Sequence, residues 1–382
     1  MSFFGSKKKQ KVIAVLELAS DSVSGMLFRQ NKEDNPEVIS DIRMPVNFLL
    51  DVNFDAFWRC TRASLQKVIE KMLKDYPSGP DACLCVFLSP WFISQTKIIN
   101  IQKKEPFKIT RSFFEKLLKS EEESFKGKGM LCLEREFIKV ELNGYHTKSP
   151  LEKFAKKARM HLYISLGMEK VETEIEKEVL KNFGDIPLLF KTFPLVVFKI
   201  LSKIINTQEG LLLVVIGGEI TDVLLIRKDS PEETISFPWG SNSLLRKITS
   251  EFKTFPKEAS SIFQIYLRGH TTEKNAEKTS RIIKEVKKRW CDFFQKALGS
   301  ISEKGPLPQN IFLAGGEIID SQFIKCAEDE SFSKFTLLGK PFNVKKILAE
   351  GLTPYFVAPK LGFGKEKDVL LMLESLYANK VL

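Results

Sequence analysis

The sequence predicts an α/β protein with two similar halves and a smaller unit of sheet and helix between them. Three observations lead to this fold class. The 382 residues exceed what one hydrophobic core usually organises. Similar strand–turn–strand units recur at residues 11–28 and 211–226, one in each half of the chain. Between them, residues 83–168 have the pattern of a self-contained sheet with one or two helices.

The composition is that of a folded protein in a reducing compartment. Hydrophobic residues make up 43% and charged residues 28%, which excludes a mainly disordered or fibrous chain. No run approaches the roughly 18–20 apolar residues that span a bilayer, and the first residues lack the apolar centre of a secretory signal. The six cysteines follow no metal-ligand spacing. We therefore expect a cytoplasmic protein with reduced thiols.

The formal charge of +11 raises the question of an anionic partner. Of the 59 basic residues 47 are Lys, and they are spread along the chain beside 48 acidic residues. Recognition of phosphates and base edges favours Arg. This pattern favours a solvated surface and no nucleic-acid partner, with a nucleic-acid binder kept as an alternative.

The first half begins with a β-hairpin. Residues 11–16 and 23–28 are apolar runs, separated by the small-residue turn Ala19, Ser20 and Asp21. Apolar side chains at helical spacing then predict a helix over 63–73, and YPSGPD at 76–81 ends it.

The inserted subdomain is predicted from short strands and one capped helix. Residues 83–88 and 96–101 are strand candidates, and Thr110 can cap the helix that follows. Apolar and charged residues alternate before Asn143-Gly144, a sequence typical of a hairpin turn. Alternation resumes over 160–166, which completes the sheet.

The second half repeats the arrangement of the first. Residues 194–205 are apolar at helical spacing and predict a helix. Strands are predicted at 211–216 and 223–226 around the turn Gly217-Gly218-Glu219. A long helix over 273–298 precedes a third buried strand, 311–314, that runs into Gly315-Gly316.

These turns suit phosphate binding. Small residues let backbone N–H groups approach phosphate oxygens, and an acidic residue at the end of the preceding strand can hold hydrated Mg²⁺. Two halves that carry such turns could hold a nucleotide between them.

The same segments carry a family resemblance. VLELASDSVSGML (15–27), LVVIGGEITDVLL (213–225) and IFLAGGEIIDSQF (311–323) resemble the first phosphate, second phosphate and adenosine motifs of the actin, Hsp70 and sugar-kinase superfamily. Within it the chain is most similar to the FtsA family of cell-division actin homologues and the related PilM family of type IV pilus assembly. The segments that point there are 83–166, FPLVVFKIL, FPWGSNSLLRKITSEFKTFPKEAS and LTPYFVAPKLGFG.

The resemblance implies a two-lobed actin-like, ribonuclease-H-like fold with an FtsA-type insertion. We expect a flexible tail at 1–10, a first lobe at 11–82 plus 169–200, the insertion at 83–168, a second lobe at 201–350, and a C-terminal segment, 351–382, that returns to the first lobe. The residues that would bind ATP with Mg²⁺ are Glu17, Ala19, Ser20, Gly217, Gly218, Thr221, Asp222, Gly240, Gly315 and Gly316.

Departures from the motifs concern the groups that do chemistry. Glu17 stands where the family has Asp, and Ala19 where it has Gly. Val215 replaces the Asp that would anchor the metal, so no metal ligand is expected there. Glu219 would place a carboxylate against phosphate charge. We therefore assign no catalytic residue and expect impaired or lost hydrolysis.

The resulting hypothesis is a cytoplasmic scaffold or adaptor of a membrane-associated assembly, in cell division or pilus biogenesis. It would bind a membrane-anchored assembly protein and self-associate through residues 83–168. Phe3-Phe4 beside Lys7, Lys8 and Lys9 suggests a peripheral membrane contact. The alternative is an active Mg-dependent ATPase or kinase of the same superfamily, in which Glu17 and Asp222 manage metal and water.

Overall fold

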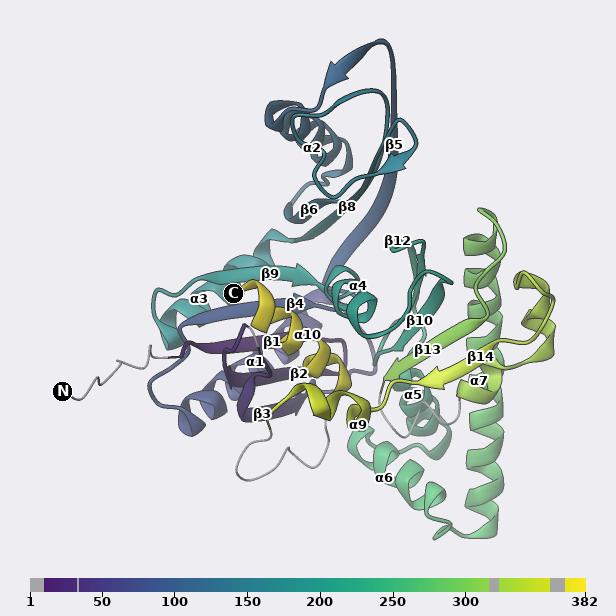
Figure 1. Ribbon diagram of the computed structural model, residues 1–382. Coiled ribbons are helices and arrows are strands. Elements are labelled where there is room, and N and C mark those ends of the chain that lie inside the picture. Colours follow the sequence, from purple (N-terminus) through teal and green to yellow (C-terminus); the bar gives the residue numbers. More distant parts are fainter. Residues whose placement is uncertain (1–9, 33, 316–322, 358–367) are drawn as a thin grey trace.

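The computed structural model describes residues 10–32, 34–315, 323–357 and 368–382. Two five-stranded sheets form the two lobes, and a four-stranded sheet forms a subdomain that projects from the first lobe (Figure 1). The part of the N-terminal tail at residues 1–9 lies outside the described residues, so the expectations for Phe3-Phe4 stay predictions.

The first sheet has the strand order β3-β2-β1-β4-β9. Its strands are β1 (Val12–Leu18), β2 (Ser22–Arg29), β3 (Glu37–Pro45), β4 (Ala82–Phe87) and β9 (Leu188–Thr192). The predicted hairpin is confirmed, because β1 and β2 pair antiparallel. One face packs on α1 (Phe54–Asp75) and α3 (Glu169–Phe183), and the other on α4 (Phe193–Ile204) and α10 (Val369–Val381).

The second sheet repeats this arrangement with the order β12-β11-β10-β13-β14. Its strands are β10 (Leu211–Ile216), β11 (Thr221–Arg227), β12 (Ser230–Phe237), β13 (Asn310–Gly315) and β14 (Asn343–Lys346). The outer face packs on α5 (Ser241–Phe252), α6 (Pro256–Leu267) and α7 (Glu273–Ser302). The short helices in the last part of the chain include η1 (Glu330–Phe335), α9 (Ala349–Leu352) and η2 (Thr353–Tyr355).

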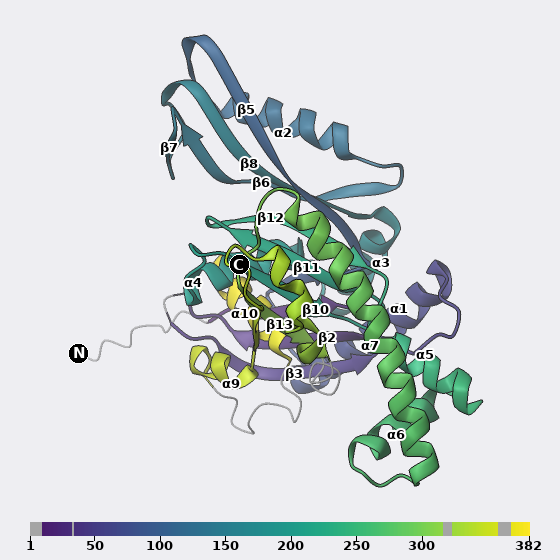
Figure 2. The same ribbon diagram turned by 90° about the vertical axis from the view of Figure 1, so that its right-hand side faces the viewer.

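The inserted subdomain is an antiparallel sheet with one helix across a face (Figure 2). Its elements are β5 (Phe92–Lys108), α2 (Arg111–Phe125), β6 (Met130–Leu142), β7 (Tyr145–His146) and β8 (Phe154–Met168). The side chain of Thr110 caps α2 as predicted, and Asn143 and Gly144 both adopt positive φ in the hairpin turn.

The predicted start of the insertion needs a correction. Residues 83–87 belong to β4, which lies between β1 and β9 and pairs parallel with both. A strand of a small sheet and a central strand of a larger sheet can have the same run of six apolar residues, because both are buried. Only the pairing partners place it in the first lobe.

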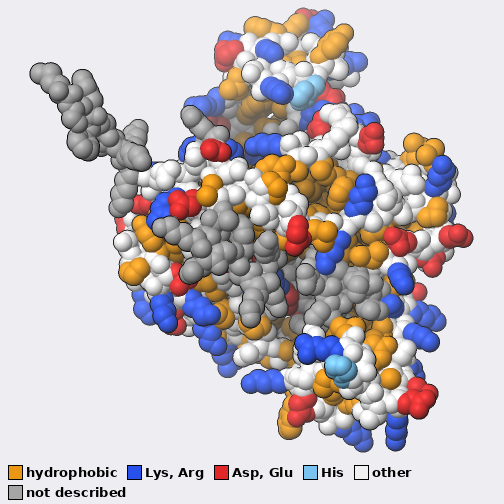
Figure 3. All heavy atoms as spheres, turned by 60° about the horizontal axis from the view of Figure 1, so that its bottom comes forward, with side chains coloured by type: hydrophobic (Ala, Val, Ile, Leu, Met, Phe, Trp, Pro, Cys, Tyr) orange, Lys and Arg blue, Asp and Glu red, His pale blue; other side chains and the backbone are white. Residues whose placement is uncertain are grey.

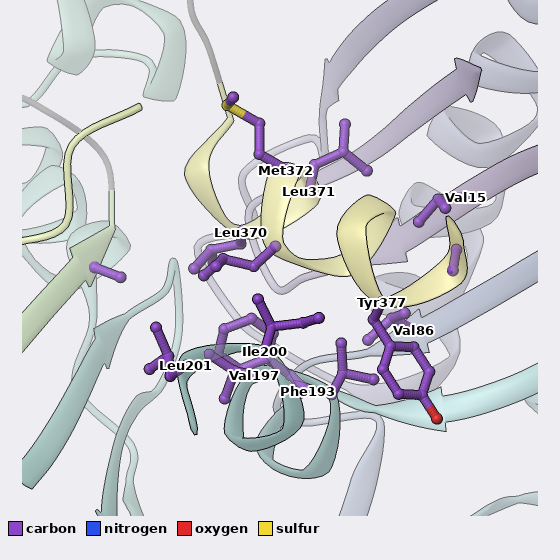
Figure 4. Packing of buried hydrophobic residues seen from close by; sticks show 14 of the residues in the cluster. Val15, Val86, Phe193, Val197, Ile200, Leu201, Leu370, Leu371, Met372 and Tyr377 are labelled. Atoms are coloured by element: carbon purple, nitrogen blue, oxygen red, sulfur yellow. The ribbon is translucent and has the colours of Figure 1, made fainter. Parts of the chain in front are cut away.

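A single hydrophobic cluster joins the two lobes. It contains the inward face of β1, with Ile13 and Val15, and the inward face of β10, with Leu213 and Val215. Helices α4 and α10 lie between the two sheets and contribute Val197, Ile200, Leu371 and Tyr377, among others (Figure 4). The C-terminal helix is therefore a core element, with most of its residues buried.

Candidate functional site

The two turns that were predicted to hold phosphates face each other between the lobes and are in direct contact. The backbone N–H of Glu219, in the β10–β11 turn, donates to the Ser20 hydroxyl in the β1–β2 turn at 3.0 Å. A Cβ atom on Gly218 would lie 2.7 Å from the Cβ of Asp21. In this arrangement atoms of the two turns occupy the space between them.

Glu17 lies beneath the first turn and is fully buried. Strand alternation points it to the face that α10 covers, where Asp368 and Glu374 are also found. Burial raises its pKa well above the usual value, and the negative charges of Asp368 and Asp21 add to the rise against the opposing charge of Arg43. A buried carboxyl of this kind is not placed to hold a hydrated cation between the turns.

Arg43 links this buried group to the turn. It forms ion pairs with Asp21, at 3.0 Å, and with Asp368, whose other bonds cap the first turn of α10. The Ser24 hydroxyl donates to Asp368 as well, at 2.8 Å. The β1–β2 turn is thus tied to the C-terminal helix through charged groups.

The Glu219 carboxylate takes the role that an anionic ligand would have. It accepts hydrogen bonds from Asn242 at 2.7 Å and from Arg246 at 2.6 Å, both on α5. Arg246 also donates to the backbone oxygen of Leu49 in the first lobe, at 3.0 Å. The positive group that could attract a phosphate is therefore engaged by a carboxylate of the same lobe.

The N-terminus of α5 is also engaged. The N–H groups of Ser241 and Asn242 donate to the backbone oxygens of Gly217 and Gly218, at 2.9 and 2.8 Å. A Cβ on Gly240 would lie 2.4 Å from the Gly217 oxygen, so only glycine permits this approach. Gly217, Gly218 and Gly240 come together as predicted, but they pack against one another.

Thr221 and Asp222 point to opposite faces of β11, as neighbours in a strand do. Thr221 lies in the core of the second lobe, where its hydroxyl donates to the Trp239 oxygen at 2.6 Å and accepts from the Trp290 indole at 3.1 Å. Asp222 faces the first lobe and accepts hydrogen bonds from Ser89, at 2.8 Å, and Ser236. Burial outweighs these bonds and raises the pKa of Asp222 to about 6.

The remaining predicted residues have backbone roles. The Ala19 oxygen accepts from the Trp91 indole at 3.2 Å, which holds Trp91 in the core. Gly315 ends β13 and pairs with Ile216 of β10. Gly316 lies outside the described residues, so the adenosine side of the predicted site is described only in part.

Several residues of this contact do not belong to any motif that could be recognised in the sequence. Asn242 and Arg246 lie one turn apart on α5 and both bind Glu219. Ser89 lies 133 residues before its partner Asp222 and contacts it only in the folded chain. Arg43 and Asp368 meet only when α10 returns to the first sheet. In the sequence, only the two turns that resemble phosphate-binding turns pointed to this region. They did not predict the ion pairs of Arg43 and Arg246 that the structure shows.

The described residues do not fit magnesium-bound phosphate. Val215, in the place of the expected metal-binding Asp, is part of the hydrophobic cluster between the lobes. Within the described ranges no group of three or more His, Cys, Asp or Glu side chains could hold a metal ion. Among the described residues, every helix is too short or too polar to span a bilayer.

Comparison with known proteins identifies the architecture. No protein-family model and no curated protein matches the sequence. Among solved structures, the PilM-PilN type IV pilus biogenesis complex aligns with a TM-score of 0.67 at 14% identity, over 96% of this chain and 97% of the other. The chain has the PilM fold. The predicted two-lobed actin-like fold is thereby confirmed.

Other solved structures align less well. The ethanolamine utilization protein EutJ from Carboxydothermus hydrogenoformans aligns over 98% of this chain and 90% of its own, at 13% identity and a TM-score of 0.48. A Bacteroides thetaiotaomicron protein with an actin-like ATPase fold aligns over 94% and 96%, at 10% identity and a TM-score of 0.43. At such identities the likeness to PilM concerns the fold alone.

Proposed function

We propose that this protein is a scaffold or adaptor of a membrane-associated assembly, which binds a membrane-anchored assembly protein on the cytoplasmic side and does not turn over ATP. The likeness to a chain solved in a complex of type IV pilus biogenesis supports a pilus-type assembly over a division ring. Self-association through the insertion belongs to the same proposal.

One observation carries the proposal: the β1–β2 and β10–β11 turns, which resemble phosphate-binding turns, contact each other. Three polar contacts cross between the lobes in this region, Glu219 to Ser20, Asp222 to Ser89 and Arg246 to Leu49. A phosphate would have to break the first contact and approach the Glu219 carboxylate. Each such pair of like charges about 4 Å apart costs on the order of 1–4 kcal/mol in wet to partly wet surroundings.

Nucleotide binding tests the first half of the proposal. We would compare the affinity for MgATP with that for adenosine by calorimetry, and measure phosphate release in the same preparation. The closed turns predict that the phosphates add no affinity and that no phosphate is released. Tighter binding of MgATP than of adenosine, or Mg-dependent turnover, would establish the rival ATPase or kinase instead.

The variant Glu219→Gln sharpens this comparison, because it removes the carboxylate charge and keeps the hydrogen-bond acceptor. It is a better variant than a restored Asp at Val215, which would place a charge in the hydrophobic cluster. If the negative charge of Glu219 prevents phosphate binding, Glu219→Gln should bind MgATP measurably and the native chain should not.

Partner retention tests the second half. In the native host, we would purify the tagged protein from detergent-solubilised membranes, with Asp222→Asn alongside. A scaffold without turnover keeps the same membrane protein in both preparations. Loss of that protein in Asp222→Asn alone would show that the partner depends on the lobe contact between Asp222 and Ser89, and absence of any membrane protein from both preparations would reject the scaffold.

A further inference from the structure

The far end of the inserted subdomain, away from the lobes, exposes large apolar side chains. Tyr145 on β7 is 79% exposed, Phe154 at the start of β8 is 64% exposed, and Leu151 between them is 44% exposed. The other apolar side chains of this end, such as Leu142 and Ala155, are buried under α2. The three exposed ones are therefore left outside the small core.

This end is held together by short-range hydrogen bonds. The Asn143 side chain accepts from the N–H groups of Lys156 and Lys157 at 2.9 and 3.1 Å. The Lys153 ammonium donates to Thr147 at 2.8 Å, and Phe154 pairs with Lys108 at the end of β5. The turn, the connection after β7 and the start of β8 thus present their side chains from one ordered surface.

The same end is strongly basic. Residues 88–168 hold 16 Lys and Arg against nine Asp and Glu, a difference of +7 in a chain whose total is +11. The exposed basic side chains at this end are Lys103, Lys104, Lys108, Lys148, Lys153, Lys156, Lys157 and Arg159, and the exposed acidic ones are Glu105 and Glu152. Figure 3 shows Lys and Arg side chains beside hydrophobic ones on the inserted subdomain, at the top of that view.

We propose that the end of the inserted subdomain formed by residues 102–108 and 143–159 binds the anionic headgroup surface of a lipid bilayer. Tyr favours the boundary between headgroups and acyl chains, where its amphipathic ring can lie partly in each. Phe and Leu are the apolar side chains that interfacial surfaces insert below the headgroups. Each Lys or Arg near an anionic leaflet adds about 1 kcal/mol of attraction. Exposed apolar side chains and a basic charge on one surface together fit an anionic bilayer.

A nucleic acid fits this surface less well. Only one of the eight exposed basic side chains, Arg159, offers the planar fork that phosphates and base edges favour. The exposed apolar side chain of Leu151 makes no favourable interaction with a phosphate backbone. The surface lies apart from the contact between the lobes, so its test stands whether or not the region of that contact binds a nucleotide.

The experiment is co-sedimentation of the full chain with vesicles of phosphatidylcholine, with and without phosphatidylglycerol. The charge variant is Lys104→Glu, Lys156→Glu and Lys157→Glu. Its matched control, Lys274→Glu, Lys284→Glu and Lys288→Glu, makes the same charge change at exposed positions of α7 in the second lobe. The apolar variant is Tyr145→Ser with Phe154→Ser, matched by Leu337→Ser with Leu338→Ser, which are 74% and 67% exposed.

We expect binding to the anionic vesicles only, weakened by salt, and an affinity loss of about tenfold or more in the charge variant and a smaller loss in the apolar variant. Both controls should bind like the native chain, and all four variants should keep the native circular dichroism spectrum. The matched controls also separate this surface from the N-terminal tail, which every variant retains.

Three outcomes would overturn the proposal. One is absence of binding to anionic vesicles. Another is equal loss in the charge variant and its α7 control, which would show that net charge alone decides. The third comes from a parallel titration with duplex DNA or a polyglutamate peptide: tight binding of either, with no vesicle binding, would assign the surface to that class of partner.

Discussion

At the scale of single residues, the contact between the lobes shows how one carboxylate can change what a turn binds. Glu219 pairs with Arg246 and Asn242 inside its own lobe, so the charge that would repel a phosphate is also satisfied without one. Asp222, two residues beyond Ile220, faces the other lobe through Ser89. These side chains make the contact between the lobes a stable arrangement of partnered polar groups.

Asp222 gives a prediction for the pH dependence of stability. Its pKa is about 6 in the folded protein and about 3.8 without the fold, so the folded state binds the extra proton between these values. The free energy of unfolding should therefore fall as pH rises from about 4 to 6, by on the order of 1–3 kcal/mol from this group. In Asp222→Asn, which does not titrate at this position, the free energy of unfolding should fall less over the same pH range.

Urea titrations of the native chain and Asp222→Asn across this pH range measure the effect as a difference. Glu17 and Glu374, whose pKa values burial also raises, titrate in both proteins and cancel. Parallel profiles for the two proteins would contradict the prediction.

At the scale of elements, helix termini hold the turns in place. The first amides of α5 bind the carbonyl groups of the β10–β11 turn, and the cap of α10, Asp368, binds Arg43 beside the β1–β2 turn. In both cases a helix end supplies the groups that fix a turn, and both turns then meet. The position of each turn depends on a helix that comes later in the chain.

Gly240 tests the packing of α5 against its turn. Gly240→Ala would bring a Cβ within 2.4 Å of one backbone oxygen and 2.5 Å of another, so the backbone has to move. We expect a loss of about 1–3 kcal/mol in the free energy of unfolding.

Gly351→Ala is the matched control, because no atom lies within 4 Å of its added Cβ and its φ is not positive. It should leave stability unchanged or raise it by up to about 1 kcal/mol. Equal effects of the two substitutions in urea unfolding would show that Gly240 is not held by this contact.

At the scale of the whole molecule, the lobes share one core. Residues of β1, β10, α4 and α10 belong to the same hydrophobic cluster, so neither lobe can lose its inner face without exposing the other's. The inserted subdomain has separate clusters of its own around Met160 and Leu162. This arrangement favours cooperative unfolding of the two lobes.

Single-tryptophan variants test that cooperativity. Trp91 reports on the first lobe and Trp290 on the second, and both are buried. With the other tryptophans replaced by Phe, the urea midpoint from the fluorescence of each variant should coincide with the midpoint from its own far-UV circular dichroism, because a shared core leaves no stable half. At zero denaturant the far-UV circular dichroism spectra of the two variants should match. A fluorescence midpoint that differs from the circular dichroism midpoint of the same variant would show lobes that unfold independently.

Much of the framework could be predicted from the sequence because it depends on local pattern. Apolar runs and their turns located β1, β2, β10, β11 and β13, and helical periodicity located α4 and α7. The motif resemblance predicted the actin-like fold. The place of β4 was wrong, since an isolated apolar strand does not show which sheet it joins.

The sequence by itself determined the elements, the two similar turns and the apolar side chain of Val215 on β10, because each depends on residues within a few positions of one another. Only the tertiary structure decided that the turns close on each other, that Glu219 is paired with Arg246, and that Glu17 is buried under α10. Those outcomes depend on groups from opposite lobes or from the two ends of the chain, and their energies exist only once long-range packing has brought the groups together.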